Sequence, residues 1–564
     1  MLQFKVNLPA RKFYFTTARN FLILLLLIAS SFAVQAQKAK VTDNTLPKPK
    51  LVVGIVIDQM RWDYLYRFYD RYGETGFKRL LKQGFSCENT LINYIPSVTA
   101  VGHSTIYTGS VPAIHGITDN NWIDRASGKS VYCTSDSAVQ SVGTTGKSGQ
   151  MSPRNLLAST ITDELAIASN FQSKIVGVSL KDRASILPAG HTPTAAFWLD
   201  DDSGNFITSS YYMQQLPKWV NDFNQAKHID KLIAKDWHTL YPIETYTQSL
   251  PDNAIWEGKF KGETESIFPH LISSVYKNSR EDFRDTPFGN TLTLEFAKAT
   301  LDAYQLGKGS ATDFLAINCA STDYVGHMYG PNSVEVEDVY LRLDKDLGAF
   351  FDALDKKVGK GNYTVFLTAD HGASNSIKFN QAHKIPSENV NTGAIRASLN
   401  EYLKGKFDVE KLVTRVSSYQ VYYNADLIDK KKLDYNLVKQ ESINFLRKQP
   451  GISFAVDLDN IQAASIPNYI KERIINGYNY KRSGDVQIIS DPGWFSGGST
   501  GTTHGLYGPT DTHIPLIFMG WGIKHGATNR ETYMTDIAPT VAAFLHIQMP
   551  NGAIGKPIVE VLSK

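Results

Sequence analysis

The sequence predicts an α/β fold in which a mostly parallel sheet is covered by helices. Five short runs of apolar, β-branched residues have the length and composition of strands buried on both faces. Helical patterns lie between several of these runs, for example at 334–354, where apolar residues recur at helical spacing. Strands that alternate with helices favour a layered α/β architecture. The five predicted strands are residues 51–57, 174–180, 314–319, 363–368 and 514–519.

The first 36 residues have the pattern of a cleavable signal peptide. A basic stretch that includes Lys5 and Arg19 precedes an apolar run at 21–28, and small residues stand at Val34 and Ala36. The apolar run is too short to span a membrane. We therefore expect residues 1–36 to be removed and the mature chain, 37–564, to be periplasmic or secreted, without a membrane span.

Composition narrows the class of protein. The hydrophobic content of 42% is enough for a large core, and the formal net charge of +3 is too small to indicate a nucleic-acid partner. Three cysteines are too few for a disulfide scaffold. Cys319 lies in a predicted buried strand, where a packed thiol is expected, and a Cys87–Cys133 pair is left open.

Two stretches differ from the alternating pattern. Residues 195–290 are rich in Trp, Tyr, Asn and Pro, and residues 395–490 have a mixed α+β character. We interpret both as insertions into one catalytic domain that covers 37–564.

Polar residues follow four of the five predicted strands. In open α/β sheets, ligands bind beyond the carboxyl ends of the strands. The sequence therefore predicts that these side chains meet at one edge of the sheet. They are Asp58, Lys181 with Arg183, Asp323, and Asp370 with His371.

Several of these residues have metal-ligating chemistry. Asp323 and His327 are four apart, which places both on one face of a helical turn. Asp370 and His371 adjoin, and His504 lies in a glycine-rich loop. Alone, each is also explained as a helix cap, a turn residue or a loop histidine. Together with Asp58 they make three Asp and three His, the ligand types of zinc hydrolases, and the absence of Cys excludes a thiolate-bound structural zinc.

Thr99 is the candidate nucleophile. Pro96 ends an extended segment, and a helix is expected to begin near Thr99, where free amides could bind an anion beside the hydroxyl. The alternative is that Thr99 only caps this helix. We interpret His103 as a packed helix histidine, and His513 as a rival of His504 that packs beside a strand.

These motifs resemble the alkaline phosphatase superfamily. With threonine as the nucleophile, the resemblance narrows to the branch that holds nucleotide pyrophosphatase/phosphodiesterases and PafA-type alkaline phosphatases. The similarity extends nearly end to end after the signal peptide. The motifs are, in order, Gly54-x-x-x-Asp58, Pro96-Ser-Val-Thr99, Gly116-Ile-Thr-Asp-Asn-Asn-Trp122, Ser179-Leu-Lys-Asp-Arg-Ala-Ser185, Ser321-Thr-Asp-Tyr-Val-Gly-His327, Ala369-Asp-His-Gly372, Thr503-His504 and Met534-Thr-Asp-Ile-Ala-Pro-Thr540.

The resemblance implies an alkaline-phosphatase-like sandwich, with a central mostly parallel sheet flanked by helices and with inserted cap segments. It also implies two Zn²⁺ per chain. Asn120, with Asn121 as its neighbouring alternative, would hold phosphoryl oxygens together with Lys181 and Arg183. The loop after His504 departs from the family pattern. The implied ligands are Asp323, His327 and His504 for one zinc, and Asp58, Asp370, His371 and the Thr99 oxygen for the other.

The expected function is hydrolysis of small-molecule phosphate monoesters through a phosphothreonine on Thr99, by a monomer. A phosphodiesterase is the alternative within the family, and it would need an apolar slot where Lys181 and Arg183 stand. A sulfatase is disfavoured because the C/S-x-P-x-R pattern is missing. An exported binding protein without activity is the alternative of another class.

Overall fold

The computed structural model describes residues 2–3 and 46–562. The predicted signal peptide, residues 1–36, lies outside the described residues except for residues 2–3. The chain divides into two units, Met1–Pro47 and Lys48–Lys564, and everything below belongs to the second. Among the described residues, no helix has the length and apolarity that crossing a membrane requires.

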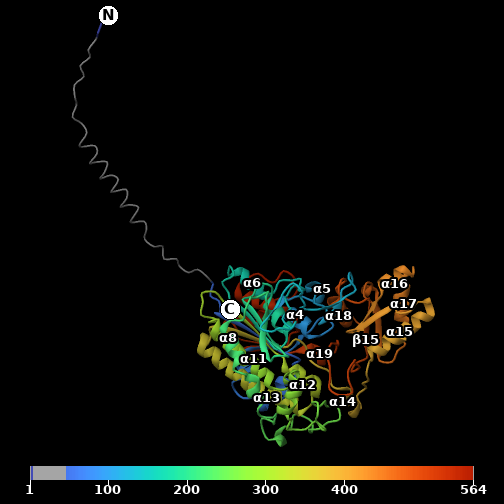
Figure 1. Ribbon diagram of the computed structural model, residues 1–564, viewed down its shortest axis with the longest axis horizontal. Coiled ribbons are helices and arrows are strands. Elements are labelled where there is room, and N and C mark those ends of the chain that lie inside the picture. Colours follow the sequence, from blue (N-terminus) through green and yellow to red (C-terminus); the bar gives the residue numbers. More distant parts are fainter. Residues whose placement is uncertain (1, 4–45, 563–564) are drawn as a thin grey trace. The chain divides into compact units, whose positions relative to one another are not determined.

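A ten-stranded sheet forms the centre of the second unit (Figure 1). Its order is β18-β2-β17-β11-β1-β10-β7-β8-β9-β6, and the five inner strands from β11 to β8 are mutually parallel. The predicted fold class is therefore confirmed. The strands are β1 Leu51–Ile57, β2 Phe85–Cys87, β6 Ser141–Val142, β7 Ile175–Val178, β8 Ala195–Asp200, β9 Asn205–Ser209, β10 Asp313–Cys319, β11 Tyr363–Thr368, β17 Leu516–Gly520 and β18 Gly526–Thr528.

Four of the five predicted strands run parallel, as expected, but the fifth does not. β17 pairs with β11 in the antiparallel direction, so its predicted orientation was wrong. It also begins later than predicted, because His513–Ile514 forms the separate strand β16, which pairs with β3 (Thr90–Leu91). An apolar run shows that a strand is buried but contains no information about its direction.

Helices cover the sheet. The predicted helix at 334–354 is α13, Val334–Leu354, which begins at an N-cap where the Ser333 side chain accepts a hydrogen bond from the Val336 amide. Buried apolar residues from the sheet and the helices join in one large core. The principal helices around it are α3 Phe77–Gln83, α4 Thr99–Thr108, α6 Ile161–Ala168, α7 Asp182–Ala189, α11 Phe288–Ala303, α12 Ser321–Tyr329, α13 and α20 Ile537–Leu545.

The stretch at 195–290 is joined to this sheet and core. Its first part supplies β8 and β9, and the remainder contains α8 (Lys218–Gln225), α9 (His228–Ile233) and α10 (Ile272–Asn278). Trp237, which is fully buried, belongs to the large core.

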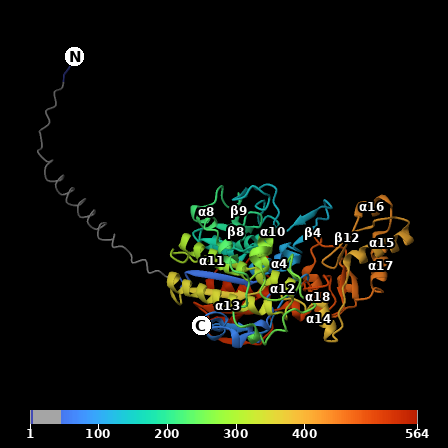
Figure 2. The same ribbon diagram turned by 60° about the horizontal axis from the view of Figure 1, so that its bottom comes forward.

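The stretch at 395–490 has a sheet and cores of its own. In both views its helices α15–α17 gather on one side, away from α8, α11 and α13 (Figures 1 and 2). Its strands are β12 Val413–Ser417, β13 Gln420–Tyr423, β14 Ile452–Asp457 and β15 Val486–Ser490, in the order β12-β13-β15-β14. Its helices are α15 Thr392–Phe407, α16 Ala425–Lys430, α17 Tyr435–Leu446 and α18 Asn468–Gly477.

All three cysteines are buried and free, so Cys87 and Cys133 form no pair in this structure. Cys319 is the last residue of β10, as expected for a packed thiol.

Candidate active site

Three predicted ligands form what we call the buried half of the site: Asp58, Asp370 and His371. Asp58 directly follows β1, and Asp370 and His371 follow the neighbouring strand β11, so the parallel register brings them together. His371 Nε2 lies 3.4 Å from Asp370 Oδ2 and 3.7 Å from Asp58 Oδ1. All three side chains are 0% exposed.

Asp323, His327 and His504 form the open half. Asp323 and His327 lie one turn apart on α12, with Asp323 Oδ1 3.2 Å from His327 Nε2 and 3.6 Å from His504 Nε2. The His327 side chain is 36% exposed. The halves adjoin, because the rings of His371 and His504 stack with centroids 3.5 Å apart. Asp58, Asp323 and His371, which come from both halves, each have one potential ligand atom within 4.8 Å of the other two.

The three histidines share one arrangement. Each places Nδ1 against a backbone carbonyl: Thr502 O for His327, Gly372 O for His371 and Ser97 O for His504, at 2.8–3.0 Å. A carbonyl only accepts, so Nδ1 carries the proton and Nε2 presents a lone pair to the acids. This orientation by a second hydrogen bond is typical of metal-ligating histidines.

Lys181 lies between the two halves. It follows β7 as the N-cap residue of α7, and its ammonium donates to Asp323 Oδ2 at 2.6 Å and to Asp58 Oδ2 at 3.0 Å. The ring of Tyr324 lies 4.8 Å from the same nitrogen. The lysine, which follows β7, is thus held at the centre of the site by contacts from residues that follow β1 and β10.

Thr99 is the first residue of α4 and is 1% exposed. The N-cap is Val98, and no side chain caps this helix, so the cap interpretation of Thr99 was wrong. The Thr99 hydroxyl oxygen lies 3.5 Å from His371 Nε2. It therefore borders the buried half at the start of a helix.

Asn120 contacts this helix start, and Arg183 lies on α7, which packs against α4. Asn120 Oδ1 accepts a hydrogen bond from the Ala100 amide at 2.9 Å, whereas Asn121 is an exposed residue of β4 (Asn121–Ile123). Arg183 Nη1 donates to the Tyr132 hydroxyl at 3.2 Å, and that hydroxyl donates to Asp182 at 2.6 Å. The ten predicted site residues thus lie at one edge of the sheet.

Sequence reasoning missed two residues of the site, Gln59 and Asn318, and interpreted a third, His103, as a packed helix histidine. Gln59 has a left-handed backbone conformation, with φ +62°. Its backbone N–H donates to Asp370 Oδ1 and its side-chain Nε2 donates to Asp323 Oδ1, so Gln59 joins both halves. Asn318 Nδ2 donates to Asp58 Oδ2. His103, predicted as a packed histidine, is fully buried, and its Nδ1 lies 3.4 Å from Asp370 Oδ2. The only feature of the sequence that could have indicated a role for Gln59 is its position directly after Asp58.

Protein groups compensate the charges of the two buried acids unequally. Burial acts against the charge of Asp370, but His371 and His103 outweigh it and lower the pKa of Asp370. Burial, followed by the charge of Asp370, raises the pKa of Asp58 to about 6. Burial, with the neighbouring His371 and His327, lowers the pKa of His504, so this imidazole stays neutral and able to ligate. Asp58 Oδ1 and Asp370 Oδ2 are buried without a hydrogen-bond partner in the described part of the chain.

His513 does not join the site. Its Nε2 lies 2.9 Å from Glu88 O, and its ring stacks on Trp62 with centroids 4.6 Å apart. The prediction that His513 packs, and that His504 is the histidine of the site, agrees with these contacts.

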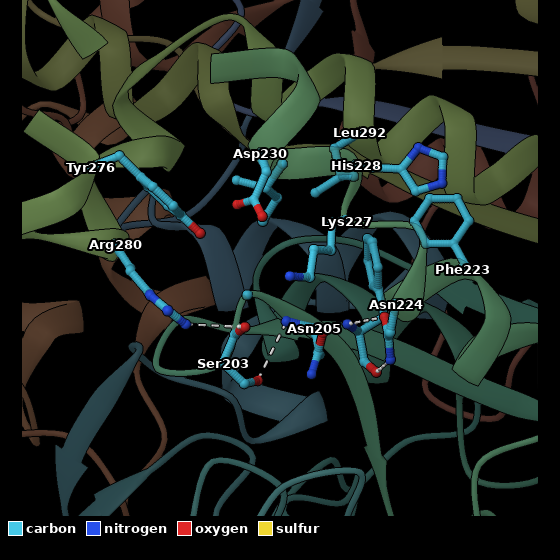
Figure 3. A pocket seen from close by; sticks show the side chains of 13 residues that line it. Ser203, Asn205, Phe223, Asn224, Lys227, His228, Asp230, Tyr276, Arg280 and Leu292 are labelled. Atoms are coloured by element: carbon cyan, nitrogen blue, oxygen red, sulfur yellow. Dashed lines mark hydrogen bonds between the residues drawn. The ribbon is translucent and has the colours of Figure 1, made fainter. Parts of the chain in front are cut away.

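A cavity of about 280 Å³ lies elsewhere, between the turn that precedes β9 and helices α8–α10 (Figure 3). Lys227, Asp230, Tyr276 and Arg280 line it, and no predicted site residue does. This cavity is therefore separate from the cluster of Asp and His side chains.

Comparisons with known proteins agree with this geometry. The family model of type I phosphodiesterase / nucleotide pyrophosphatase matches residues 52–514. The alkaline phosphatase PafA of Elizabethkingia meningoseptica is 54% identical over 551 residues, which cover 97% of this chain and 100% of the relative. The chain belongs to the PafA-type alkaline phosphatases of this family.

Solved structures of PafA support the assignment. The wild-type alkaline phosphatase PafA superposes with a TM-score of 0.91 at 55% identity, over 92% of this chain and 100% of that chain. A PafA variant with a threonine changed to serine, and an asparagine, a lysine and an arginine changed to alanine, gives a TM-score of 0.90 at 54% identity over the same shares. The lysine and the arginine are two positions apart there, as Lys181 and Arg183 are in this alkaline phosphatase.

Proposed function

We propose that this PafA-type alkaline phosphatase hydrolyses phosphate monoesters with two zinc ions and a phosphothreonine intermediate on Thr99. The observation that carries the proposal is the position of the Thr99 hydroxyl, 3.5 Å from His371 Nε2 at the start of α4. That position places a nucleophile at the boundary of the Asp and His cluster.

The residues fit a pair of zinc ions. The unpartnered oxygens Asp58 Oδ1 and Asp370 Oδ2, buried among the described residues, and the free Nε2 lone pairs are ligand atoms that zinc accepts. Asp323, His327 and His504 would hold one ion, and Asp58, Asp370, His371 and the Thr99 oxygen the other. Bound zinc would lower the pKa of an adjacent hydroxyl and stabilise charge on the departing oxygen.

The chain's own residues then position the ester. Thr99 Oγ1 would lose its proton to solvent and attack phosphorus, while the bond from phosphorus to the alcohol oxygen breaks and that oxygen takes up a proton from water. Water would later attack phosphorus, break its bond to Thr99 Oγ1 and release phosphate. Phosphoryl transfer depends on positioning and charge stabilisation more than on covalent assistance. The start of α4 would lie beside the transferred group, as at other anion-binding helix starts.

Three further residues would bind non-bridging oxygens. Asn120 is held by the Ala100 amide through Oδ1, so its Nδ2 is the group that can donate. Lys181 and Arg183 supply two positive charges, which match the dianion of a monoester. The PafA variant with substitutions at a threonine, an asparagine, a lysine and an arginine supports these assignments.

A phosphodiesterase is the second candidate, favoured by the name of the family model. The deciding experiment measures kcat/KM for a monoester and a diester that share one leaving group, on protein whose zinc content is measured in the same sample. We expect about two zinc ions per chain, a monoester preference, and loss of activity in chelator that zinc restores. Diester preference would overturn the substrate class, and full activity without metal would overturn the mechanism.

The proposal also includes export of the protein behind a cleavable signal peptide. The basic and apolar pattern of residues 1–36 supports cleavage of a signal peptide and a periplasmic or secreted enzyme. We propose that this enzyme acts as a monomer on small phosphate monoesters, without a nucleic-acid partner.

A further inference from the structure

Gln59 contacts one acid from each half of the site. It is 3% exposed and stands directly after Asp58, at the carboxyl end of β1. Its backbone N–H donates to Asp370 Oδ1 at 3.2 Å, in the buried half. Its side-chain Nε2 donates to Asp323 Oδ1 at 2.6 Å, in the open half. Only the second contact requires a glutamine, because the first is made by the backbone.

The oxygen that accepts from Gln59 is the one that faces the histidines of the open half. Asp323 Oδ1 lies 3.2 Å from His327 Nε2 and 3.6 Å from His504 Nε2, whereas Asp323 Oδ2 accepts from the Lys181 ammonium at 2.6 Å. A carboxylate only accepts, so the carboxamide of Gln59 must present its NH₂ group to Asp323. The two donors, one on each oxygen, fix the rotation of this carboxylate.

The backbone around Gln59 is held in place as well. A φ of +62° is uncommon for a residue other than glycine and persists only where the surrounding structure enforces it. Here the Asp58 carbonyl accepts from Thr322 Oγ1 at 2.6 Å, and the Met60 N–H donates to Ile57 O at 3.2 Å. The turn at 57–60 is therefore tied to the start of α12, one residue before Asp323.

Helix α12 leaves space for the carboxamide. Gly326 of this helix stands between Asp323 and His327 in the sequence. A Cβ at Gly326 would overlap Gln59 Oε1 and lie 3.0 Å from Gln59 Cδ. Glycine is unfavourable inside a helix, so its presence there needs a packing reason. The side chain of Gln59 supplies that reason.

We propose that Gln59 is a positioning residue for the zinc pair, an inference that rests on the proposed function. Its carboxamide holds Asp323 Oδ1 toward His327 and His504, while its backbone N–H connects the same residue to Asp370. Groups that hydrogen-bond to a metal ligand orient it, and removing such a group typically lowers metal affinity about 10- to 100-fold. Substitution of the side chain should therefore weaken zinc binding in the open half and not in the buried half.

The test measures the zinc affinity of the full chain by competition with a chromogenic chelator. Gln59→Met keeps the backbone N–H and a side chain of similar length, but it has no donor. In a His371→Ala chain, which keeps the open-half ligands, Gln59→Met should lower zinc affinity about 10- to 100-fold. In an Asp323→Ala chain, which keeps the buried-half ligands, the same change should have no effect, because its acceptor is already gone.

Gly326→Ala tests the same contact from the other side. Alanine favours a helix more than glycine does, so the change should not weaken α12 itself. Its Cβ would displace the Gln59 carboxamide, and zinc affinity in the His371→Ala chain should fall as it does with Gln59→Ala. Gly326→Ala should then add no further loss in a chain that already contains Gln59→Ala, because the side chain that it displaces is absent.

Gln305→Met is the matched control. Gln305 is an exposed glutamine that also has a left-handed backbone, φ +51°, and its Nε2 donates to Asp302 O at 2.6 Å. This variant should keep the zinc affinity of the wild type. Weaker binding in the Asp323→Ala chain, or unchanged binding in the His371→Ala chain, would overturn the positioning role of Gln59. A wild-type chain that binds no zinc would instead overturn the proposed function.

Discussion

The two halves of the proposed zinc site differ in their exposure to solvent. Asp58, Asp370 and His371 of the buried half are 0% exposed. In the open half His327 is 36% exposed, whereas Asp323 and His504 are 5% and 8% exposed. The nucleophile Thr99 borders the buried half. The difference fits a reaction in which attack on phosphorus is sheltered from water and the alcohol departs on the side of His327.

Removing a single acid ligand, from either half, should have the largest effect on activity. Asp370→Ala and Asp323→Ala should each lower monoester kcat/KM by about 10³- to 10⁴-fold, because one metal supplies several kcal/mol of charge stabilisation. Elemental analysis should show loss of zinc in both variants. The zinc that remains in Asp370→Ala, in the open half, should leave faster in chelator than the zinc that remains in Asp323→Ala.

Asp163→Asn is the control for this pair. Asp163 is a buried acid in the N-terminal capping box of α6, its hydrogen bonds go to Thr160, His191 and Thr192, and its variant should keep both zinc ions. Equal release rates in the two active-site variants would remove the distinction between the halves.

Thr99 tests whether the nucleophile belongs to the buried half. Thr99→Ala should fold, keep its zinc and lose about 10³-fold or more in kcat, within the range seen when a nucleophile is removed. Thr99→Ser should retain much of the activity, because only the hydroxyl is required. Phosphate trapped on the wild-type chain at low pH and absent from Thr99→Ala would identify the residue. An active Thr99→Ala would assign the attack to another group.

The residues of the two halves and the elements that carry them could be predicted from the sequence only in part. Asp58, Asp323 and Asp370 could be found because each follows a buried apolar strand or lies a few residues past one, and the ends of parallel strands meet at one edge. The helix at 334–354 was found with its bounds because its apolar spacing is uninterrupted. What these features share is that they are local in sequence.

The features that were missed depend on distant contacts. Gln59 joins the halves through Asp323, 264 positions away, and through a left-handed backbone that no pattern reports. The direction of β17 follows from its pairing with β11 and not from its own residues. The exposure of His327, on which the difference between the halves depends, is likewise set by packing alone.

Lys181 and Arg183 should have an intermediate effect that depends on the substrate. A hydrogen bond to a charged group contributes about 1.5–3 kcal/mol, so each Ala variant should lose roughly 10- to 100-fold in monoester kcat/KM. A diester has one negative charge fewer, so its hydrolysis should fall much less. Lys181 also donates to Asp58 and Asp323, one acid from each half, so zinc content must be measured in parallel.

Equal losses for monoester and diester in these variants would mean that the two cations maintain the shape of the site and do not recognise charge. In that case Lys181 would serve mainly to hold the halves together, and the monoester preference would need another source.

The smallest effect is expected at Ser418, where the segment at 395–490 reaches the active site. Ser418 lies between β12 and β13 and donates to Asp119 Oδ2, while Asp119 Oδ1 accepts from the Asn120 amide at 2.7 Å. Asn120 in turn accepts from Ala100, next to Thr99. These three hydrogen bonds would orient Asn120, so Ser418 is a positioning residue.

Ser418→Gly removes the hydroxyl and tolerates the positive φ of +45° at this position. Loss of a hydrogen bond of about 1 kcal/mol should cost roughly fivefold in monoester kcat/KM. A double-mutant cycle separates positioning from general destabilisation. If Ser418 acts through Asn120, Ser418→Gly should cost nothing further in an Asn120→Ala background, with zinc content and Tm unchanged. Ser417→Gly, one residue earlier on the hairpin, is the control and should be silent. Additive losses would show that Ser418 affects the site by another route, and the inserted sheet would then have no part in binding phosphate.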